Sequence, residues 1–142
     1  MDVINNQISI LYRLSQTYLS KKLKVYGLSH SQIATILYLA SHEDVQQNHI
    51  VEHLSLDKGS VSSMIKKMVS NGYVKKLTSP TDKRATLLML TYKSDLMLNQ
   101  ISEANQNLAN NLLDGFDRSE KKVISEYLQR MQHNAELIES LG

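Results

Sequence analysis

The stretch "TSPTDKRATLLMLT", residues 78–91, contains the only proline of the chain and two adjacent positive charges. Proline and aspartate at Pro80 and Asp82 are typical of a turn. The segments on either side, "YVKKLT" and "ATLLMLT", are rich in apolar and β-branched residues, which favours strands. The sequence therefore predicts one β-hairpin with Asp82, Lys83 and Arg84 at its turn.

The remainder of the chain has the apolar period of helices, and glycine marks several helix ends. Gly27, Gly72 and Gly115 each follow a periodic segment, where a left-handed glycine is expected. Capping boxes are formed by Ser29 with Gln32 and by Asp117 with Glu120, and single caps by Asp57 and Thr91. These signals predict helices over residues 3–25, 33–40, 47–54, 58–71 and 92–114, and a last one after 117.

Length and composition restrict the class of protein. A chain of 142 residues that is 42% apolar is enough for one domain with its own core. The absence of cysteine excludes disulfides, thiol redox sensing and sulfur-ligated metal, and it fits a reducing cytoplasm. No apolar run approaches the roughly 20 residues of a membrane span, and no signal-peptide pattern is present. A soluble cytoplasmic protein is therefore expected.

The positive charge is concentrated in one part of the sequence. The whole chain has a net charge of +2, but the window from Asp57 to Thr86 holds seven basic and two acidic residues and carries +5. The rest of the chain therefore carries −3. A local positive charge of this kind is typical of a nucleic-acid-binding surface.

The order helix, short helix, tight turn, helix and hairpin predicts a winged helix-turn-helix. In this arrangement the helix over 58–71 enters the major groove of DNA, and the hairpin reaches the backbone or the minor groove. Val61, Ile65 and Met68 recur at helical spacing and are expected to face the core. The opposite side is expected to contact bases and phosphates through Lys58, Gly59, Ser60, Ser62, Ser63, Lys66 and Lys67. Close approach to a phosphate would explain the glycine in the first helical turn.

Three segments carry a resemblance that covers essentially the whole chain. "LSHSQIATILYLA", "HIVEHLSLDKGSVSSMIKKMVSNGYVKK" and "SPTDKRATLLMLT" resemble the MarR (multiple antibiotic resistance regulator) family of bacterial transcription factors. The resemblance implies that Arg84 enters the minor groove and that Asp82 orients it. The chain departs from the family pattern at Ser94, where a glycine is frequent, and at Ala85 and Thr86, where an acidic and basic pair often follows the wing arginine.

The resemblance also implies a homodimer formed by the first and the last two helices. Helices of about 23 residues span roughly 35 Å, more than a three-helix DNA-binding core needs, so a second copy of the chain is expected to cover their apolar faces. The prediction is a mainly α protein with a small β-hairpin wing, one unit over residues 1–142. Residues 28–91 form its DNA-binding lobe, and residues 1–26 and 92–142 form its helical dimerisation lobe.

The expected function is that of a repressor that binds double-stranded DNA at a pseudo-palindromic operator and is released by a small molecule. As the family suggests, a phenolic or other amphipathic effector would be bound among four tyrosines, Tyr12, Tyr18, Tyr26 and Tyr38. Their simpler interpretation is core and interface packing. No cofactor is expected.

Two other functional classes can be compared with this one. A zinc-responsive regulator of the same fold would use histidine and carboxylate ligands, and "SHED" places His42 beside Glu43 and Asp44. Against it, residues 92–114 carry no histidine. An enzyme is rejected, because the sequence has no nucleophile and base at a recognisable spacing, no phosphate-cradling glycine loop and no paired-carboxylate motif.

Overall fold

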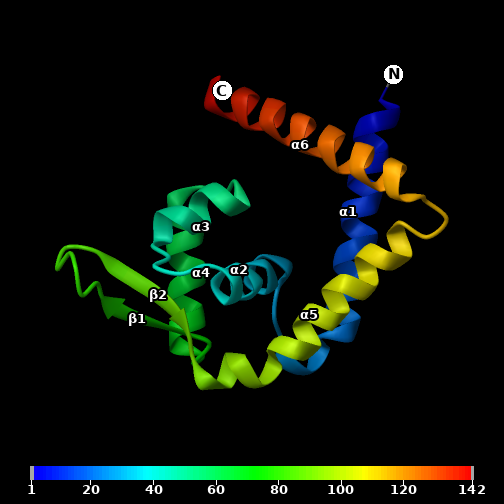
Figure 1. Cartoon of the computed structure of the whole chain (residues 1–142). Coiled ribbons are helices and arrows are strands. Elements are labelled where there is room, and N and C mark those ends of the chain that lie inside the picture. The colour runs from blue at the N-terminus through cyan, green and yellow to red at the C-terminus, as the bar shows by residue number, and fades with distance from the viewer. Residues whose placement is uncertain (1, 142) are drawn as a thin grey trace. The chain divides into compact units, whose positions relative to one another are not determined.

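A computed structural model describes residues 2–141 of the chain (Figure 1). Over this range the protein is mainly helical with one two-stranded antiparallel sheet. The elements in chain order are α1 (Val3–Lys22), the 3₁₀ helix η1 (Lys24–Tyr26), α2 (His30–Ser41), α3 (Gln47–Leu54), α4 (Lys58–Ser70), β1 (Val74–Thr78), β2 (Thr86–Leu90), α5 (Tyr92–Leu112) and α6 (Arg118–Leu141). The predicted fold class, helices with a β-hairpin wing, is confirmed.

The local signals of the sequence act as expected at most helix ends. The capping boxes of Ser29 with Gln32 and of Asp117 with Glu120 both form. Gly27, Gly72 and Gly115 all have positive φ, at 64°, 80° and 83°. The first helix is shorter than predicted, because it ends at Lys22 and the chain tightens into η1 before Gly27.

The chain divides into two compact units between Leu108 and Ala109. The first unit contains α1 to α4, the hairpin and most of α5. Its core is a single apolar cluster to which α1, α2, α3, α4, the hairpin and α5 all contribute. At its centre Ile36, Ile50, Val61, Ile65, Met68 and Ile101 are all 0% exposed.

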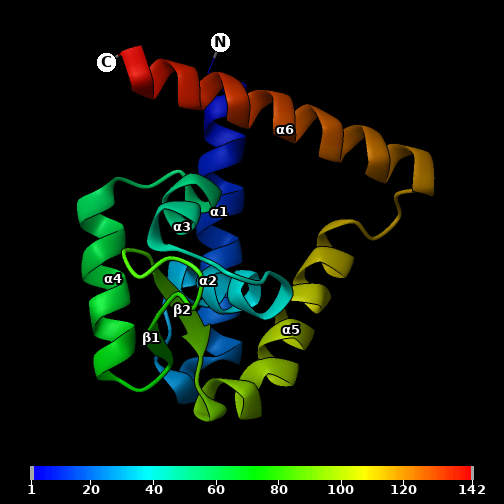
Figure 2. The same ribbon diagram turned by 60° about the vertical axis from the view of Figure 1, so that its left-hand side comes forward.

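The hairpin lies beside α4 in the first unit (Figure 2). Its register runs from Val74 opposite Leu90 to Thr78 opposite Thr86. Val74 and Leu88 are buried, while Lys75 and Lys76 are exposed. The N–H of Leu88 also donates to the carbonyl of Val45, which joins the wing to the segment before α3. The wing is therefore attached to the segment before α3 through the middle of β2, and to the core through the buried Val74 and Leu88.

The second unit contains the end of α5 and α6. Its main element, α6, has 24 residues and buries none of them. Its exposed apolar side chains include Val123, Tyr127, Leu128, Met131, Ile138 and Leu141. Within residues 2–141, no helix is both long enough and apolar enough to cross a membrane.

Candidate nucleic-acid interface

Helix α4 separates an apolar side from a polar one, as its sequence predicts. Val61, Ile65 and Met68 are 0% exposed and hold the helix against the core. The seven residues predicted to contact DNA are all exposed: Lys58, Gly59, Ser60, Ser62, Ser63, Lys66 and Lys67. The hydroxyls of this set lie in its N-terminal half and two of the ammonium groups follow them, so α4 offers short polar side chains and long cations along one exposed side.

The N-terminus of α4 is capped by Asp57. Its Oδ1 accepts a hydrogen bond from the N–H of Ser60 at 2.7 Å, and its Oδ2 accepts one from the Ser60 hydroxyl at 2.7 Å. These two bonds lower the pKa of Asp57 below its ordinary value, the backbone bond contributing most. The Ser60 hydroxyl, which the sequence predicts as a DNA contact, therefore already has a partner within the chain.

Gly59 has a local explanation beside the predicted approach to a phosphate. A Cβ at this position would lie 3.3 Å from Asp57 Oδ1, the oxygen that caps the helix. A side chain here would crowd the capping carboxylate. Glycine at this position therefore leaves room for the cap, although it costs roughly 1 kcal/mol relative to alanine in a helix interior.

The tip of the wing is ordered by its own hydrogen bonds. Ser79 is 8% exposed. Its hydroxyl accepts hydrogen bonds from the N–H groups of Thr81 and Asp82, both at 3.3 Å. Asp82 Oδ1 accepts the N–H of Arg84 at 3.0 Å and lies 3.9 Å from its Nε. The Arg84 side chain is 97% exposed, so the turn presents a guanidinium to the surroundings with a carboxylate beside it.

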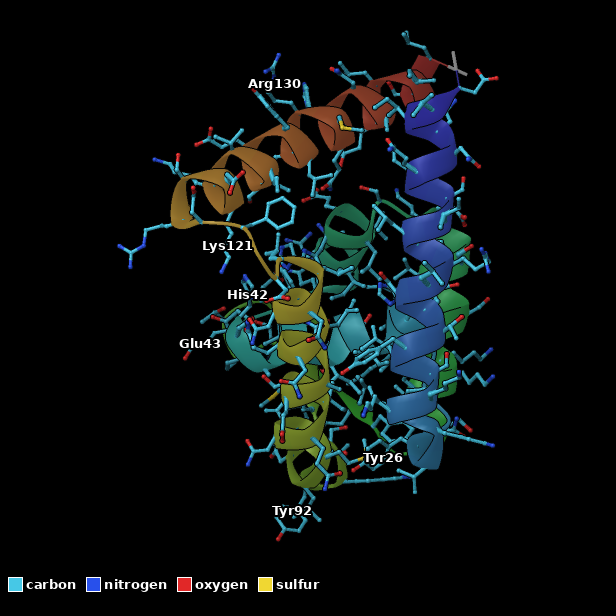
Figure 3. All side chains as sticks on the ribbon, turned by 90° about the vertical axis from the view of Figure 1, so that its right-hand side faces the viewer. Tyr26, His42, Glu43, Tyr92, Lys121 and Arg130 are labelled. Atoms are coloured by element: carbon cyan, nitrogen blue, oxygen red, sulfur yellow. The ribbon has the colours of Figure 1, made fainter. Side chains whose placement is uncertain are left out.

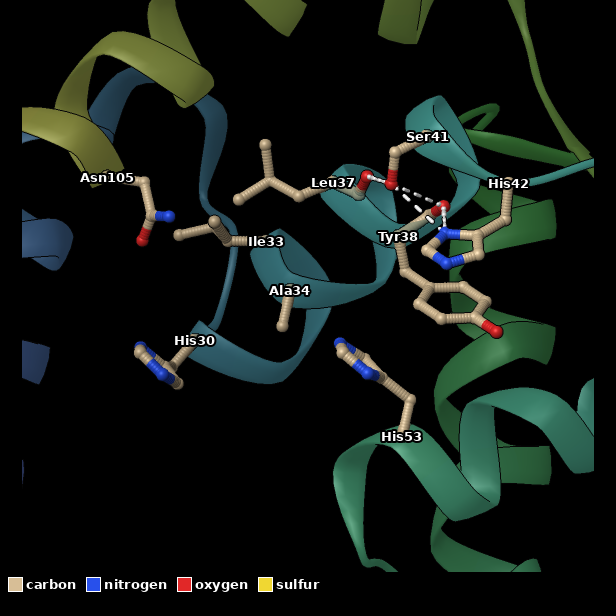
Figure 4. Close-up of a pocket in the computed structure, with 9 residues that line it drawn as sticks. All are labelled: His30, Ile33, Ala34, Leu37, Tyr38, Ser41, His42, His53 and Asn105. Atoms are coloured by element: carbon tan, nitrogen blue, oxygen red, sulfur yellow. Dashed lines mark hydrogen bonds between the residues drawn. The ribbon is translucent and has the colours of Figure 1, made fainter. Parts of the chain in front are cut away.

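A cavity of about 280 Å³ lies elsewhere in the first unit (Figure 4). Its lining residues are His30, Ile33, Ala34, Leu37, Tyr38, Ser41, His42, His53 and Asn105. The ring of Tyr38 stacks on His42 with centroids 3.9 Å apart, and its centroid is 4.5 Å from that of His53. Nδ1 of His30 is buried and has no hydrogen-bond partner in the described part of the chain. Aromatic rings, aliphatic side chains, one serine hydroxyl and one amide thus line the cavity, and none of its nine lining residues carries a carboxylate.

Of the four tyrosines predicted for a ligand site, one lines this cavity. Tyr38 does so, and Tyr12 contacts the lining residue His30 edge-on, at 5.9 Å between centroids. Tyr18 and Tyr26 pack partly buried against the core and are not among the lining residues. Sequence reasoning missed His53 and Asn105 as lining residues, because both come from other helices and no local spacing connects them to Tyr38. His42 is four residues after Tyr38, and that helical spacing could have shown the pair.

The histidines do not assemble a metal site in the described residues. Between positions 2 and 141, no three histidine or carboxylate side chains are grouped as ligands. His49 instead closes the start of α3, where its Nδ1 accepts the N–H of Gln46 at 2.9 Å. The structure therefore gives no support to the zinc interpretation.

Comparison with known proteins agrees with this architecture. Residues 26–85 match the family model described as MarR family. The HTH-type transcriptional regulator MgrA of Staphylococcus aureus is 26% identical over 121 residues, which cover 85% of this chain and 81% of that protein.

Solved structures resemble the chain over almost its full length. A MarR transcriptional regulator from Methanosarcina mazei Go1 has 28% identity and a TM-score of 0.79, covering 97% of this chain and 99% of that one. The S. aureus MepR–DNA complex, at 15% identity and a TM-score of 0.86, shares the fold over 94% of this chain and 97% of that one. Residues 26–85 therefore carry a match to the MarR family, and the proteins that resemble the chain over most of its length are transcriptional regulators, not enzymes.

Proposed function

We propose that the protein is a repressor that binds a pseudo-palindromic DNA operator as a homodimer and that a small-molecule effector releases it. The observation that carries the proposal is the shared exposure of the polar side of α4 and of the wing arginine, Arg84. A helix of this kind fits the major groove, and a basic hairpin tip fits the adjacent minor groove.

The polar residues of α4 and the wing divide into two roles. Ser62 and Ser63 are exposed in the first half of the helix, where side chains of a recognition helix reach base edges. Lys66 and Lys67 are further along and would neutralise phosphates, which adds affinity without sequence information. Arg84 would enter the minor groove, where A·T-rich sequence strengthens the negative potential.

Exposed apolar helix faces support a homodimer. In α1, Ile4 is 57%, Ile8 45% and Leu11 51% exposed, and in the second unit α6 buries no residue. Large apolar side chains at helical spacing are not left in water when a partner surface is present, because their burial is favourable. A second copy of the chain offers the matching apolar surface.

The residues that line the cavity around Tyr38 limit which small molecules could bind there as an effector. Its imidazoles and its Asn105 amide can donate hydrogen bonds, whereas the Ser41 hydroxyl already donates to the Leu37 carbonyl at 3.0 Å. The aromatic wall of the cavity suits a flat ring. Because no carboxylate lines it, an anion would meet no negative charge among the lining side chains. A small phenol or aromatic carboxylate is the class of effector that we propose.

The DNA part of the proposal is tested by selection from a random duplex library, followed by sequencing of the retained fragments. We expect a motif with twofold symmetry whose half-sites are about one helical turn apart, at roughly 10–10.5 base pairs. Retained fragments without any twofold-related motif would contradict operator binding by a dimer.

The dimer is tested with the double variant Ile8→Glu/Leu11→Glu and analytical ultracentrifugation. Two charges on the exposed face of α1 should give a folded monomer, whereas deleting the helix would also remove Leu19, a core residue that is 1% exposed. Val25→Glu, at an 83% exposed valine outside α1, is the matched control and should stay dimeric. A double variant that remains a dimer would place the interface elsewhere.

The effector is tested with benzoate and phenol as probes in an operator-binding titration. Either probe should weaken operator binding at millimolar concentration, and His53→Ala should reduce that response because His53 lines the cavity. If neither probe acts, or if His53→Ala responds like the wild type, this cavity is not the effector site.

A further inference from the structure

The turn between the recognition helix and the wing is held by side chains from the start of α5. Residues 71–73 connect α4 to β1, and their three consecutive carbonyls each accept a side-chain hydrogen bond. Lys93 Nζ donates to Asn71 at 2.9 Å, the Thr91 hydroxyl donates to Gly72 at 2.5 Å, and the Ser94 hydroxyl donates to Tyr73 at 2.6 Å. We call Thr91, Lys93 and Ser94 the α5 clamp.

Ser94 is the buried member of the α5 clamp, whereas Lys93 is exposed. Ser94 is 0% exposed and Tyr73 is 8% exposed, so the bond between them lies in a region of low dielectric. The hydroxyl of Thr91 also accepts the N–H of Ser94 at 3.4 Å, which ties the clamp to the first turn of α5. The Tyr73 carbonyl also accepts the backbone N–H of Thr91 at 3.2 Å, so removing the Ser94 hydroxyl takes away one of its two hydrogen bonds in a buried site.

The same turn is attached to a second element on its other side. The Tyr73 hydroxyl donates to the carbonyl of Tyr26 in η1 at 3.1 Å, and η1 directly follows α1. The ammonium of Lys93 lies 4.4 Å from the centroid of the Tyr73 ring. Tyr26 and Tyr92, at the start of α5, lie at the same end of the first unit (Figure 3).

Gly72 gives the turn a backbone conformation that other residues rarely adopt. Its φ of +80° lies in the left-handed region, and a Cβ at this position would lie 3.8 Å from Lys93 Cδ. The recognition helix and the wing therefore share one fixed junction, which hydrogen bonds join to η1 and to α5.

We propose that Ser94 and Tyr73 are positioning residues that set the separation between the two recognition helices of a dimer. This inference rests on the proposed function, because it assumes dimeric operator binding. Val61, Ile65 and Met68 hold α4 against the core, and the junction 71–73 joins the C-terminal end of α4 to α5 and, through η1, to α1, which carries a proposed dimer face. The orientation of α4 relative to that face therefore depends in part on the rigidity of the junction. A loosened junction would let each α4 reach half-sites at more than one spacing.

The test compares Ser94→Ala and Tyr73→Phe with the wild type on three operators. These have the selected half-site spacing, one base pair more and one base pair less; each step turns a half-site by about 35° along a helix of roughly 10–10.5 base pairs per turn. We expect the variants to lower the preference for the selected spacing by about fivefold while binding to a single half-site stays unchanged. A decrease in stability alone would not change the preference among spacings.

Thr35→Val is the control for stability. Thr35 is 0% exposed; its hydroxyl donates to the Ser31 carbonyl at 2.8 Å and lies 3.8 Å from Met64 Sδ in α4, and neither partner belongs to the junction 71–73. It should lower the melting temperature and keep the spacing preference.

Two outcomes are distinguishable. If the wild type prefers one spacing and both variants of the junction keep that preference, the inference is overturned while the proposed function stands. If the wild type itself shows no preference, dimeric operator binding is overturned. Should Ser94→Ala not fold, Tyr73→Phe decides the question, since it keeps the buried bond between Ser94 and the Tyr73 carbonyl and removes only the bond to the Tyr26 carbonyl.

Discussion

At the scale of single residues, Arg84 and Asp82 form a pair whose geometry suits presentation to a partner better than stabilisation. Their side chains are 97% and 60% exposed, and their closest charged atoms are 3.9 Å apart. Exposed ion pairs contribute little to the free energy of unfolding, so stability is a poor explanation for the pair. Orientation of the guanidinium for DNA is the role that we propose.

Arg84→Ala should weaken specific DNA binding by at least tenfold, about 1.4 kcal/mol, because it removes the proposed minor-groove contact. Asp82→Ala should have the same effect in milder form, since it frees the guanidinium to adopt other rotamers. Fluorescence anisotropy on one operator measures both, with circular dichroism to confirm folding. Arg118→Ala, an exposed arginine outside the DNA-binding lobe, is the charge-matched control. A folded Arg84→Ala dimer with wild-type affinity would show that the wing does not contact DNA in this way.

Asp57, which caps the N-terminus of α4, makes the stability of the protein depend on pH. Hydrogen bonds from Ser60 lower the pKa of its carboxyl in the folded protein, so the stabilisation is complete above the ordinary pKa of aspartate. This stabilisation is lost as the pH falls through the pKa that Asp57 has in the folded protein, which is the lower of the two values. Asp57→Ala should therefore lower the melting temperature at neutral pH, and its difference from the wild type should shrink below about pH 4.

Asp57→Asn serves as the control for this pH dependence, because its side-chain oxygen can accept one hydrogen bond without titrating. Its difference in melting temperature from Asp57→Ala should stay constant with pH. If the difference in melting temperature between the wild type and Asp57→Ala does not change down to about pH 3, the ionised carboxylate is not what stabilises this helix end.

At the scale of elements, α4 packs against the core through one side and leaves the other side for the DNA contacts that we propose. Val61, Ile65 and Met68 recur at helical spacing and are each 0% exposed. The polar side chains of the opposite face are exposed, because a helix that packs through one stripe leaves its other side to the surroundings. The burial that positions the helix therefore also determines which of its side chains are free for the proposed DNA contacts.

Ser62→Ala and Ser63→Ala should change which bases are preferred in each half-site while lowering affinity only modestly. Both hydroxyls are on the exposed side of α4, where we propose that base edges are read. Selection and sequencing of bound fragments for each variant measures the preference. Lys67→Ala is the comparison: it should weaken binding to all sequences about equally, as expected of a residue that binds phosphate. Unchanged half-site preferences in both serine variants would exclude them from base reading.

At the scale of the whole molecule, the distribution of charge says more about the proposed DNA binding than the net charge does. The window from Asp57 to Thr86 carries +5 in a chain whose net charge is +2. All seven of its basic residues are exposed: Lys58, Lys66, Lys67, Lys75, Lys76, Lys83 and Arg84. In a dimer this surface would occur twice, which makes phosphate neutralisation a large part of the expected affinity.

Operator affinity should therefore fall steeply with salt, by a factor on the order of 10³ between about 50 and 200 mM if at least six phosphates are neutralised. The slope of log affinity against log salt measures how many phosphates the protein neutralises. Lys66→Ala should make this slope shallower by about one unit for each phosphate that the lysine neutralises. A flat salt response would remove the electrostatic part of the proposal.

Features that depend on a few neighbouring residues could be predicted without any structure. The caps at Ser29, Asp57 and Asp117 were predictable because the partner of each side chain is only three residues away. The buried stripe of α4 and the hairpin were predictable because helices and strands repeat with fixed periods. The family resemblance added the fold in which these elements combine.

Which distant residues meet could be learned only from the folded chain. Ser94 and Tyr73 are 21 residues apart and bond because α5 packs against the junction of α4 and β1. Asn105 lines the cavity with Tyr38 because α5 returns past α2, and no pattern along the chain records that proximity. Caps and periods arise from short-range backbone geometry, whereas the clamp and the cavity arise from the packing of whole elements, to which each side chain contributes only a part.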